Sequence, residues 1–213
     1  PGAGSAAAAS ALDATSGARW IRLLYAYPRR FTDAIIDAIA RCERVVDYVD
    51  LPLQHISDPV LERMGRRVTR RDVETLLGKL RERIDGVTLR TTFIVGFPGE
   101  TERDFRELLT FVRSFRFDAV GVFEFSPEPG TPAPDLDDQL DAAVVAERAE
   151  RLMRAQRDVA FQANRRAVGR TVQVLVDGTD ASGACLGRHA GQAPDIDGRC
   201  ILTEPRSAGT FVR

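Results

Sequence analysis

A repeated alternation of strand-like and helix-like segments is the feature that most restricts the fold of this chain. Apolar runs with the length and composition of strands occupy residues 20–27, 45–53, 87–95 and 119–125, and each is followed by a helical segment or by a loop that leads to one. Strands separated by helices pair in parallel through right-handed crossovers. The sequence therefore predicts an α/β fold with a parallel sheet, either an open doubly wound sheet or part of a (β/α) barrel.

Threonines at three positions predict where helices begin. Thr32 precedes a short amphipathic segment, and the pairs Thr69–Asp72 and Thr101–Asp104 have the spacing of a capping box. Behind each start, apolar residues recur at helical spacing and mark one buried face. The three faces consist of Ile35, Ile36 and Ile39; of Val73, Leu76, Leu77, Leu80 and Ile84; and of Phe105, Leu108, Leu109, Val112 and Phe115.

Changes in composition divide the chain into three parts. Residues 1–18 are small and turn-prone, with too few large apolar side chains for a core, so we expect a flexible leader. Residues 19–167 contain the strand–helix units, a loop with four prolines (SPEPGTPAP) and a long polar helix over about 141–166. Residues 168–213 switch to short alternating strands between Gly, Asp and Pro turns, which predicts a small β domain with an open, unclosed edge.

Composition argues against several classes of protein. No stretch reaches the roughly 18 apolar residues that a membrane span needs, and we expect no signal peptide. The formal net charge of -1 gives no overall basic field that would attract nucleic acid. The three cysteines, Cys42, Cys185 and Cys200, form no CxxC pair. We therefore expect free thiols, no metal site in this chain and a cytoplasmic protein.

Polar residues and glycines follow the second and third predicted strands, at the end where ligands bind in parallel β/α folds. The Gln54 amide can hydrogen-bond a ligand and the His55 imidazole can move a proton, although His55 alone is also typical of a satisfied core residue. In GFPGE, Gly96 and Gly99 permit a close approach of the backbone to an anion or amino-acid group, and Glu100 lies beside a helix start. A Gly-Pro-Gly sequence is equally typical of an ordinary turn.

Arginines supply further candidates. Arg90 lies within an otherwise apolar strand, so its charge requires a partner, either a carboxylate such as Glu124 or the carboxylate of a ligand. Two arginine clusters can face RNA, although neighbouring acidic residues favour pairing along solvated helix faces. They consist of Arg63, Arg66, Arg67, Arg70 and Arg71, and of Arg148, Arg151, Arg154 and Arg157.

Four segments in this order resemble the radical SAM methylthiotransferases: WIRLLYAYP, VDLPLQHISDPVLERMGRR, LRTTFIVGFPGET and FEFSPEPGTPA. The likeness extends over nearly everything from Trp20 onward. It is closest to the enzymes that methylthiolate an aspartate of the twelfth protein of the small ribosomal subunit. The histidine of LPLQH, in place of serine, favours these enzymes over their tRNA-modifying relatives.

The resemblance implies a partial parallel (β/α) barrel of the radical SAM type, with about four of six strands, followed by a small TRAM-like β-barrel domain. It also implies S-adenosylmethionine (SAM) and two four-iron, four-sulfur clusters as cofactors of the full-length family. The SAM side would include Gln54, Arg90, Gly96, Gly99, Glu100 and Phe125. We expect Gln54, Arg90 and Glu100 to face one shared cavity. No residue is assigned a catalytic role.

The resemblance also implies partners. The TRAM-like part has five arginines and five acidic residues, and this balance favours a ribosomal-protein substrate, with the ribosome as a candidate partner and weak or absent RNA binding. The family's CxxxCxxC motif, which ligates a cluster, does not occur in the 213 residues, so the isolated chain is predicted to be inactive. Three interpretations stay open: a fragment of the ribosomal-protein enzyme or of a tRNA-modifying relative, a cluster-free ribosome- or RNA-docking module, and an enzyme that uses the barrel mouth without iron.

Overall fold

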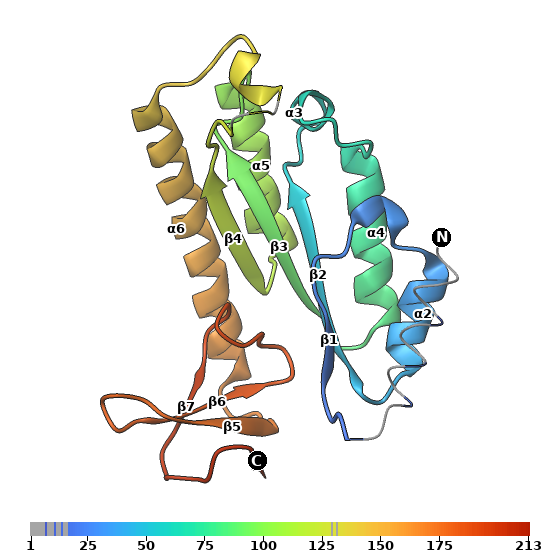
Figure 1. Cartoon of the computed structure of the whole chain (residues 1–213), viewed down its shortest axis with the longest axis vertical. Coiled ribbons are helices and arrows are strands. Elements are labelled where there is room, and N and C mark those ends of the chain that lie inside the picture. Colours follow the sequence, from blue (N-terminus) through green and yellow to red (C-terminus); the bar gives the residue numbers. More distant parts are fainter. Residues whose placement is uncertain (1–6, 8–10, 12–13, 15–16, 129, 131) are drawn as a thin grey trace.

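The computed structural model describes residues 7, 11, 14, 17–128, 130 and 132–213. Its described part contains two four-stranded sheets, one parallel and one antiparallel, together with a set of helices (Figure 1). The leader expected over residues 1–18 lies largely outside the described residues. The α/β fold class is confirmed, because a parallel sheet with helices is followed by a small antiparallel sheet.

The parallel sheet has the order β1-β2-β3-β4, so each strand lies beside the strand that precedes it in the sequence. Its strands are β1 (Ile21–Leu23), β2 (Val45–Gln54), β3 (Thr88–Val95) and β4 (Ala119–Glu124). The pairing of β3 with β4 is unbroken, whereas the pairing of β2 with β3 shifts between Leu51 and Gln54. The four strands therefore join the sheet in the order in which they occur in the sequence, as repeated strand–helix units predict.

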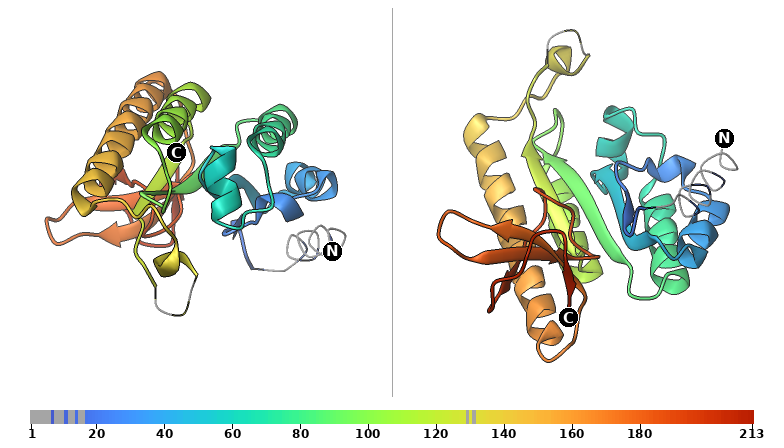
Figure 2. Two further views of the ribbon diagram at one scale, coloured as in Figure 1. Left: turned by 90° about the horizontal axis from the view of Figure 1, so that it is seen from above. Right: turned by 60° about the horizontal axis from the view of Figure 1, so that its bottom comes forward.

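Helices cover one face of this sheet, as the view from above in Figure 2 shows. They are α2 (Asp33–Arg41), α3 (Asp58–Arg63), α4 (Arg70–Arg83), α5 (Glu102–Phe115) and α6 (Ala142–Ala167), with the short 3-10 helices η1 (Pro28–Arg30) and η2 (Ala133–Asp135) in the connections. Both expected capping boxes, Thr69–Asp72 and Thr101–Asp104, are present. In the described part, no helix combines the length and the hydropathy that crossing a membrane requires.

The two faces of the parallel sheet carry different side chains, because successive residues of a strand point to opposite sides. Val49 and Leu51 of β2 and Leu89 of β3 belong to the apolar core beneath the helices. The alternating residues Asp50 and Arg90 therefore lie on the opposite face, which we call the inner face. They are in register with each other and form an ion pair at 2.9 Å.

The expected first strand over residues 20–27 is wrong in length, because β1 has only three residues. Tyr25 adopts a left-handed backbone conformation (φ 57°), and the amide groups of Tyr25 and Ala26 donate to the side chain and the carbonyl oxygen of Asp50. Thr32 does precede α2, but its hydroxyl makes no capping hydrogen bond and has no partner among the described atoms. An apolar run alone cannot show which backbone groups a side chain from another strand will satisfy.

The antiparallel sheet has the order β7-β6-β5-β8. Its strands are β5 (Val174–Thr179), β6 (Cys185–His189), β7 (Cys200–Leu202) and β8 (Phe211–Val212). β7 and β8 are its edge strands. Figure 1 shows this sheet near the end of the parallel sheet where β2 and β3 begin, so it lies opposite the loops that follow their carboxyl ends.

Candidate functional site

The turn from Gly96 to Glu100 follows β3 at the carboxyl end of the parallel sheet. Gly96 and Gly99 both have positive φ values, 78° and 82°, which other residues rarely adopt. A Cβ atom at Gly96 would lie 2.4 Å from Cγ2 of Val145 in α6, and one at Gly99 would lie 2.7 Å from Nε of Arg63. The close packing of α6 therefore requires glycine at position 96, and the positive φ values favour glycine at both positions, whatever the turn binds.

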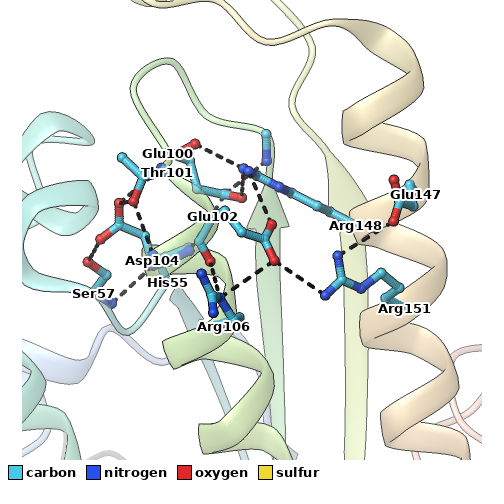
Figure 3. A network of polar contacts seen from close by, with 11 residues as sticks. His55, Ser57, Glu100, Thr101, Glu102, Asp104, Arg106, Glu147, Arg148 and Arg151 are labelled. Atoms are coloured by element: carbon cyan, nitrogen blue, oxygen red, sulfur yellow. Dashed lines mark hydrogen bonds and ion pairs between the residues drawn. The ribbon is translucent and has the colours of Figure 1, made fainter.

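Glu100 is 3% exposed and holds this turn from within the protein (Figure 3). One carboxylate oxygen accepts a hydrogen bond from the Gly96 amide at 2.9 Å, and the other accepts one from Nη1 of Arg148 in α6 at 2.6 Å. The same Nη1 also donates to the Glu100 carbonyl oxygen at 2.9 Å. The Glu100 side chain thus ties the turn to α6.

His55 lies behind the same turn and has no exposed surface. Its Nδ1 accepts a hydrogen bond from the Ser57 amide at 3.0 Å, so the proton of a neutral ring sits on Nε2, which lies 3.6 Å from a carboxylate oxygen of Glu100. No hydrogen bond of Nε2 is found among the described atoms. His55 is therefore buried in the core, but only one of its two ring nitrogens is satisfied there, and its role in proton transfer stays a prediction.

Ser57 extends the network to the start of α5 (Figure 3). Its hydroxyl donates to one oxygen of Asp104, and the other oxygen accepts from the amide and hydroxyl of Thr101. Burial alone would raise the pKa of Asp104, but these hydrogen bonds outweigh it and hold the pKa below its ordinary value. An ionised Asp104 therefore joins the loop after β2 to the loop after β3.

Gln54 is the last residue of β2 and has a left-handed φ of 72°, which costs a non-glycine residue on the order of 1 kcal/mol. Its side-chain Oε1 is buried and has no hydrogen-bond partner among the described atoms. An unpaired buried oxygen of this kind costs about 1–3 kcal/mol. A hydrogen-bond donor on a ligand would remove that cost, so Gln54 stays a candidate for ligand binding.

Arg90 is placed differently from the other candidates. It is the third residue of β3 and lies about 20 Å along the strand direction from Gly96, at the usual rise of about 3.3 Å per residue. Its Nη1 donates to Asp50 at 2.9 Å, and its Nε lies 3.6 Å from Asp197 of the antiparallel domain. Arg90 therefore belongs to the inner face, near the amino end of the sheet.

The prediction that Glu124 pairs with Arg90 is wrong. Glu124 is in register with Val95, whereas Arg90 is in register with Ala119, about 16 Å earlier along β4. Sequence reasoning missed the true partner, Asp50. An aspartate inside an apolar strand was the available signal, because such a residue also requires a partner when buried.

Phe125 packs beside the turn that follows β3. Its ring centroid lies 5.2 Å from that of Phe97, and its amide donates to the Val95 carbonyl oxygen at 2.9 Å. The structure therefore brings Phe125 together with the GFPGE turn, at the carboxyl end of the sheet.

The expectation that Gln54, Arg90 and Glu100 face one shared cavity is wrong. The Glu100 carboxylate points toward Arg148 of α6, whereas Arg90 pairs with Asp50 on the inner face. Helix packing decides the direction of Glu100, and strand alternation decides that of Arg90. Of the three side chains, Gln54 alone combines a place at the carboxyl end with a buried polar atom that lacks a partner among the described residues.

Side chains of the inner face also hold the antiparallel domain. The Tyr48 hydroxyl donates to Asp197 at 2.7 Å, and Nη2 of Arg22 donates to the Ala190 carbonyl oxygen at 2.7 Å. Burial, and after it the hydrogen bond to Asp197, raises the pKa of Tyr48 above its ordinary value. Together with Arg90, these contacts join two parts of the chain that are far apart in sequence.

The three cysteines form no disulfide and lie apart along the fold: Cys42 follows α2, Cys185 begins β6 and Cys200 begins β7. Within the described residues, no group of three or more His, Cys, Asp or Glu side chains could hold a metal ion. An iron–sulfur cluster needs several converging thiolates, so the residues present do not fit one. The unpaired Gln54 amide oxygen and the glycine turn are groups that fit a nucleotide cofactor.

Comparisons with known proteins agree with this architecture. The model of the radical SAM superfamily matches residues 7–112, and that of the TRAM domain matches residues 168–213. A protein from Geobacter sulfurreducens named ribosomal protein uS12 methylthiotransferase RimO is 49% identical over 205 residues, which cover 95% of this chain and 46% of that protein. A protein of the same name from Desulforamulus reducens is 44% identical over 92% of this chain and 45% of its own length. The chain thus spans less than half the length of these curated relatives.

Among solved structures, coproporphyrinogen III oxidase (HemN) from Escherichia coli, described as a radical SAM enzyme, matches with a TM-score of 0.52 over 68% of this chain and 32% of that one. At 19% sequence identity, this likeness supports the fold alone. The family models and the relatives together account for the parallel sheet and for the antiparallel domain that follows it. The chain therefore belongs to the radical SAM methylthiotransferase family.

Proposed function

We propose that this chain is part of an enzyme that transfers a methylthio group to an aspartate of a small-subunit ribosomal protein. The observation that carries the proposal is an identity of 44–49% to proteins named uS12 methylthiotransferases, over more than nine tenths of this chain. His55 of the LPLQH segment adds support, because a histidine in place of serine at this position favours the ribosomal-protein enzymes over their tRNA-modifying relatives. A ribosomal substrate would place the activity in the cytoplasm.

SAM and two four-iron, four-sulfur clusters are the proposed cofactors of the full-length enzyme. SAM bound beside a cluster supplies radical chemistry. This chain has no CxxxCxxC motif, and its three cysteines lie on separate elements, so we propose that the isolated chain is inactive. Its contribution to the full enzyme is one wall of the SAM site.

The residues at the carboxyl end of the sheet would contribute in different ways. Oε1 of Gln54, which has no partner among the described atoms, would accept a hydrogen bond from SAM. Gly96 and Gly99 would present backbone rather than side chains to the cofactor, and Glu100 would hold that backbone in place. Phe125 would pack beside the turn as an apolar wall.

Arg90 would contribute from the inner face. Asp50 and Asp197 engage its Nη1 and Nε, whereas no hydrogen bond of its Nη2 is found within the described residues. A Cβ atom at Gly121 would lie 3.4 Å from Nη2, so this nitrogen lies over a position without a side chain. Nη2 would then be the nitrogen of Arg90 that binds a carboxylate of the ligand.

The charge pairing on the surface of the TRAM domain favours a protein over RNA as the partner that this domain binds. Three of its five arginines form ion pairs with acidic residues of the same domain, namely Arg188 with Asp177, Arg199 with Asp195 and Arg206 with Glu204. Paired charges leave little net field to attract phosphate groups. We therefore expect this domain to contact the ribosomal protein and to bind RNA weakly or not at all.

A chimaera tests the proposal. The amino-terminal part of the Geobacter sulfurreducens relative is joined to this chain, and its clusters are reconstituted anaerobically. The chimaera is then incubated with SAM, sulfide, uS12 and a one-electron reductant that reduces the clusters. Mass spectrometry should show one methylthio group on an aspartate of uS12. An intact, cluster-loaded chimaera that leaves uS12 unmodified would refute the proposal.

Two controls accompany this test. Gln54→Leu in the chimaera should lower SAM affinity about tenfold or more, by the loss of a hydrogen bond to a buried group, while leaving the cluster absorbance unchanged. The isolated chain, taken through the same reconstitution, should bind no stoichiometric iron. A clear cluster spectrum from the isolated chain would contradict the proposed inactivity.

A further inference from the structure

The first arginine cluster, residues 63–71, divides into two groups in the structure. Arg63 and Arg66 donate to backbone carbonyl oxygens, and Arg70 forms an ion pair with a glutamate four residues later. Arg67 and Arg71 are exposed and form no hydrogen bond or ion pair within the described residues. The pairing expected for the whole cluster therefore leaves two guanidinium groups unused.

Arg67 and Arg71 line an open hollow of about 420 Å³ between η1, α2 and α4. Arg29 of η1 also lines it and likewise has no hydrogen bond or ion pair within the described part of the chain. The volume lies within the range of small-ligand sites, roughly 300–1,000 Å³. The hollow lies beside helices α2 and α4, away from the Arg90–Asp50 ion pair of the inner face.

The side chains that line this hollow carry a net positive charge. Four are basic and two are acidic, whereas the whole chain has a formal net charge of -1. Lys79 pairs with Asp33 at 2.8 Å, and the Asp72 carboxylate accepts the capping hydrogen bonds of Thr69. The three unpaired arginines are therefore the groups left to attract an anion.

The floor of the hollow consists of apolar residues, of which only Phe31 offers surface to a ligand. Val68, Val73 and Leu76 are buried beneath it, whereas the Phe31 ring is half-buried. A guanidinium group binds phosphate oxygens through two parallel N–H groups, and an apolar floor with an aromatic ring suits the face of a nucleobase. A run of acidic residues would satisfy the arginines but has no planar ring to stack on Phe31.

We propose that this hollow is a binding site for single-stranded RNA, in which Arg29, Arg67 and Arg71 contact the phosphodiester backbone and a base lies over the apolar floor. The site is separate from the proposed methylthio-transfer chemistry and from the neutral TRAM surface. It would let the enzyme hold a substrate protein that is surrounded by RNA. A single small site of this kind gives weak binding, with a Kd on the order of 10⁻⁴ to 10⁻⁶ M.

Fluorescence anisotropy of the 213-residue chain with a labelled RNA of about 12 nucleotides tests the proposal. The variant Arg29→Gln/Arg67→Gln/Arg71→Gln removes the three arginines of the hollow. The matched control, Arg113→Gln/Arg165→Gln/Arg166→Gln, removes the same charge from exposed arginines that belong to neither arginine cluster. All six side chains are exposed, so both variants should keep the thermal unfolding curve of the parent.

The hollow variant should bind RNA at least tenfold more weakly than the parent, and the control should stay within about threefold. The slope of log K against log salt should fall by about 2 in magnitude, because each contact to single-stranded phosphate contributes about 0.7. Equal losses in both variants would overturn the proposal, since only overall charge would then matter.

Three competing ligands decide the chemical class of the occupant. Polyglutamate that binds as tightly as the RNA, with the same sensitivity to the hollow variant, would show a site for acidic peptides and overturn the proposal. If AMP or inorganic phosphate binds as tightly as the RNA, the hollow is a site for a small phosphate ligand, and this result would also overturn the proposal. Competition by AMP only at concentrations well above the RNA Kd would support a backbone site that reads one nucleotide of a longer strand.

Discussion

The ion pair between Arg148 and Glu100 should contribute more to stability than any exposed pair of the chain, and Arg148→Met tests this. The substitution keeps most of the aliphatic volume and leaves a carboxylate that is 3% exposed without its cation. Breaking a buried pair in this way costs about 3–5 kcal/mol. For a chain of this size, each kcal/mol lowers Tm by about 2–4 °C, so we expect a decrease on the order of 10 °C.

Arg154→Met is the matched control, because Arg154 pairs with Glu150 on the exposed side of the same helix and should cost at most about 1 kcal/mol. The double variant Glu100→Gln/Arg148→Met should be more stable than the sum of the single changes implies, with a coupling of about 1–3 kcal/mol. Urea denaturation followed by circular dichroism measures all of these free energies. If Arg148→Met costs no more than Arg154→Met and shows no coupling to Glu100, the network does not hold the turn as argued.

Three further predictions concern the turn, the network and the domain junction. Gly96→Ala should cost about 2–4 kcal/mol in urea denaturation, through positive φ and overpacking, whereas Gly65→Ala, with positive φ but open space, should cost about 1 kcal/mol; equal costs would contradict the packing argument. The lowered pKa of Asp104 stabilises the fold above the ordinary carboxyl pKa and is lost as pH falls through the folded-state value, so Asp104→Asn should show a smaller loss of stability between about pH 5 and pH 3 than the parent; an unchanged pH profile would argue against an ionised Asp104. Tyr48→Phe removes a donor to Asp197 and should cost about 1–3 kcal/mol and speed proteolysis between the two sheets; an unchanged cleavage rate would exclude a role of this bond in docking.

Local features of the fold could be predicted because their causes lie within a few residues. The capping boxes at Thr69 and Thr101 are made by residues three positions apart, and the buried faces of α4 and α5 follow from helical spacing. The parallel sheet follows from the alternation of strands and helices, which leaves few other ways to pair the strands. The GFPGE turn and Phe125 come together for the same reason, because the loops that follow parallel strands gather at one end of the sheet.

Partner choice depended on the tertiary structure. Arg90 was expected to find Glu124 or a ligand and instead pairs with Asp50, because the register between β2 and β3 sets which side chains meet. Glu100 was expected to face a cofactor and instead binds Arg148, because α6 packs against the turn.

By itself, the sequence determined the order of the elements, the strand-end position of the GFPGE turn and the family to which the chain belongs. Only the tertiary structure decided which charged side chains pair with each other inside the protein. It also showed that Arg29, Arg67 and Arg71 form no ion pair within the described residues and are available to bind a ligand. The physical reason is that the energy of a charge pair depends on distance and burial, which strand register and helix docking fix between residues far apart in the chain.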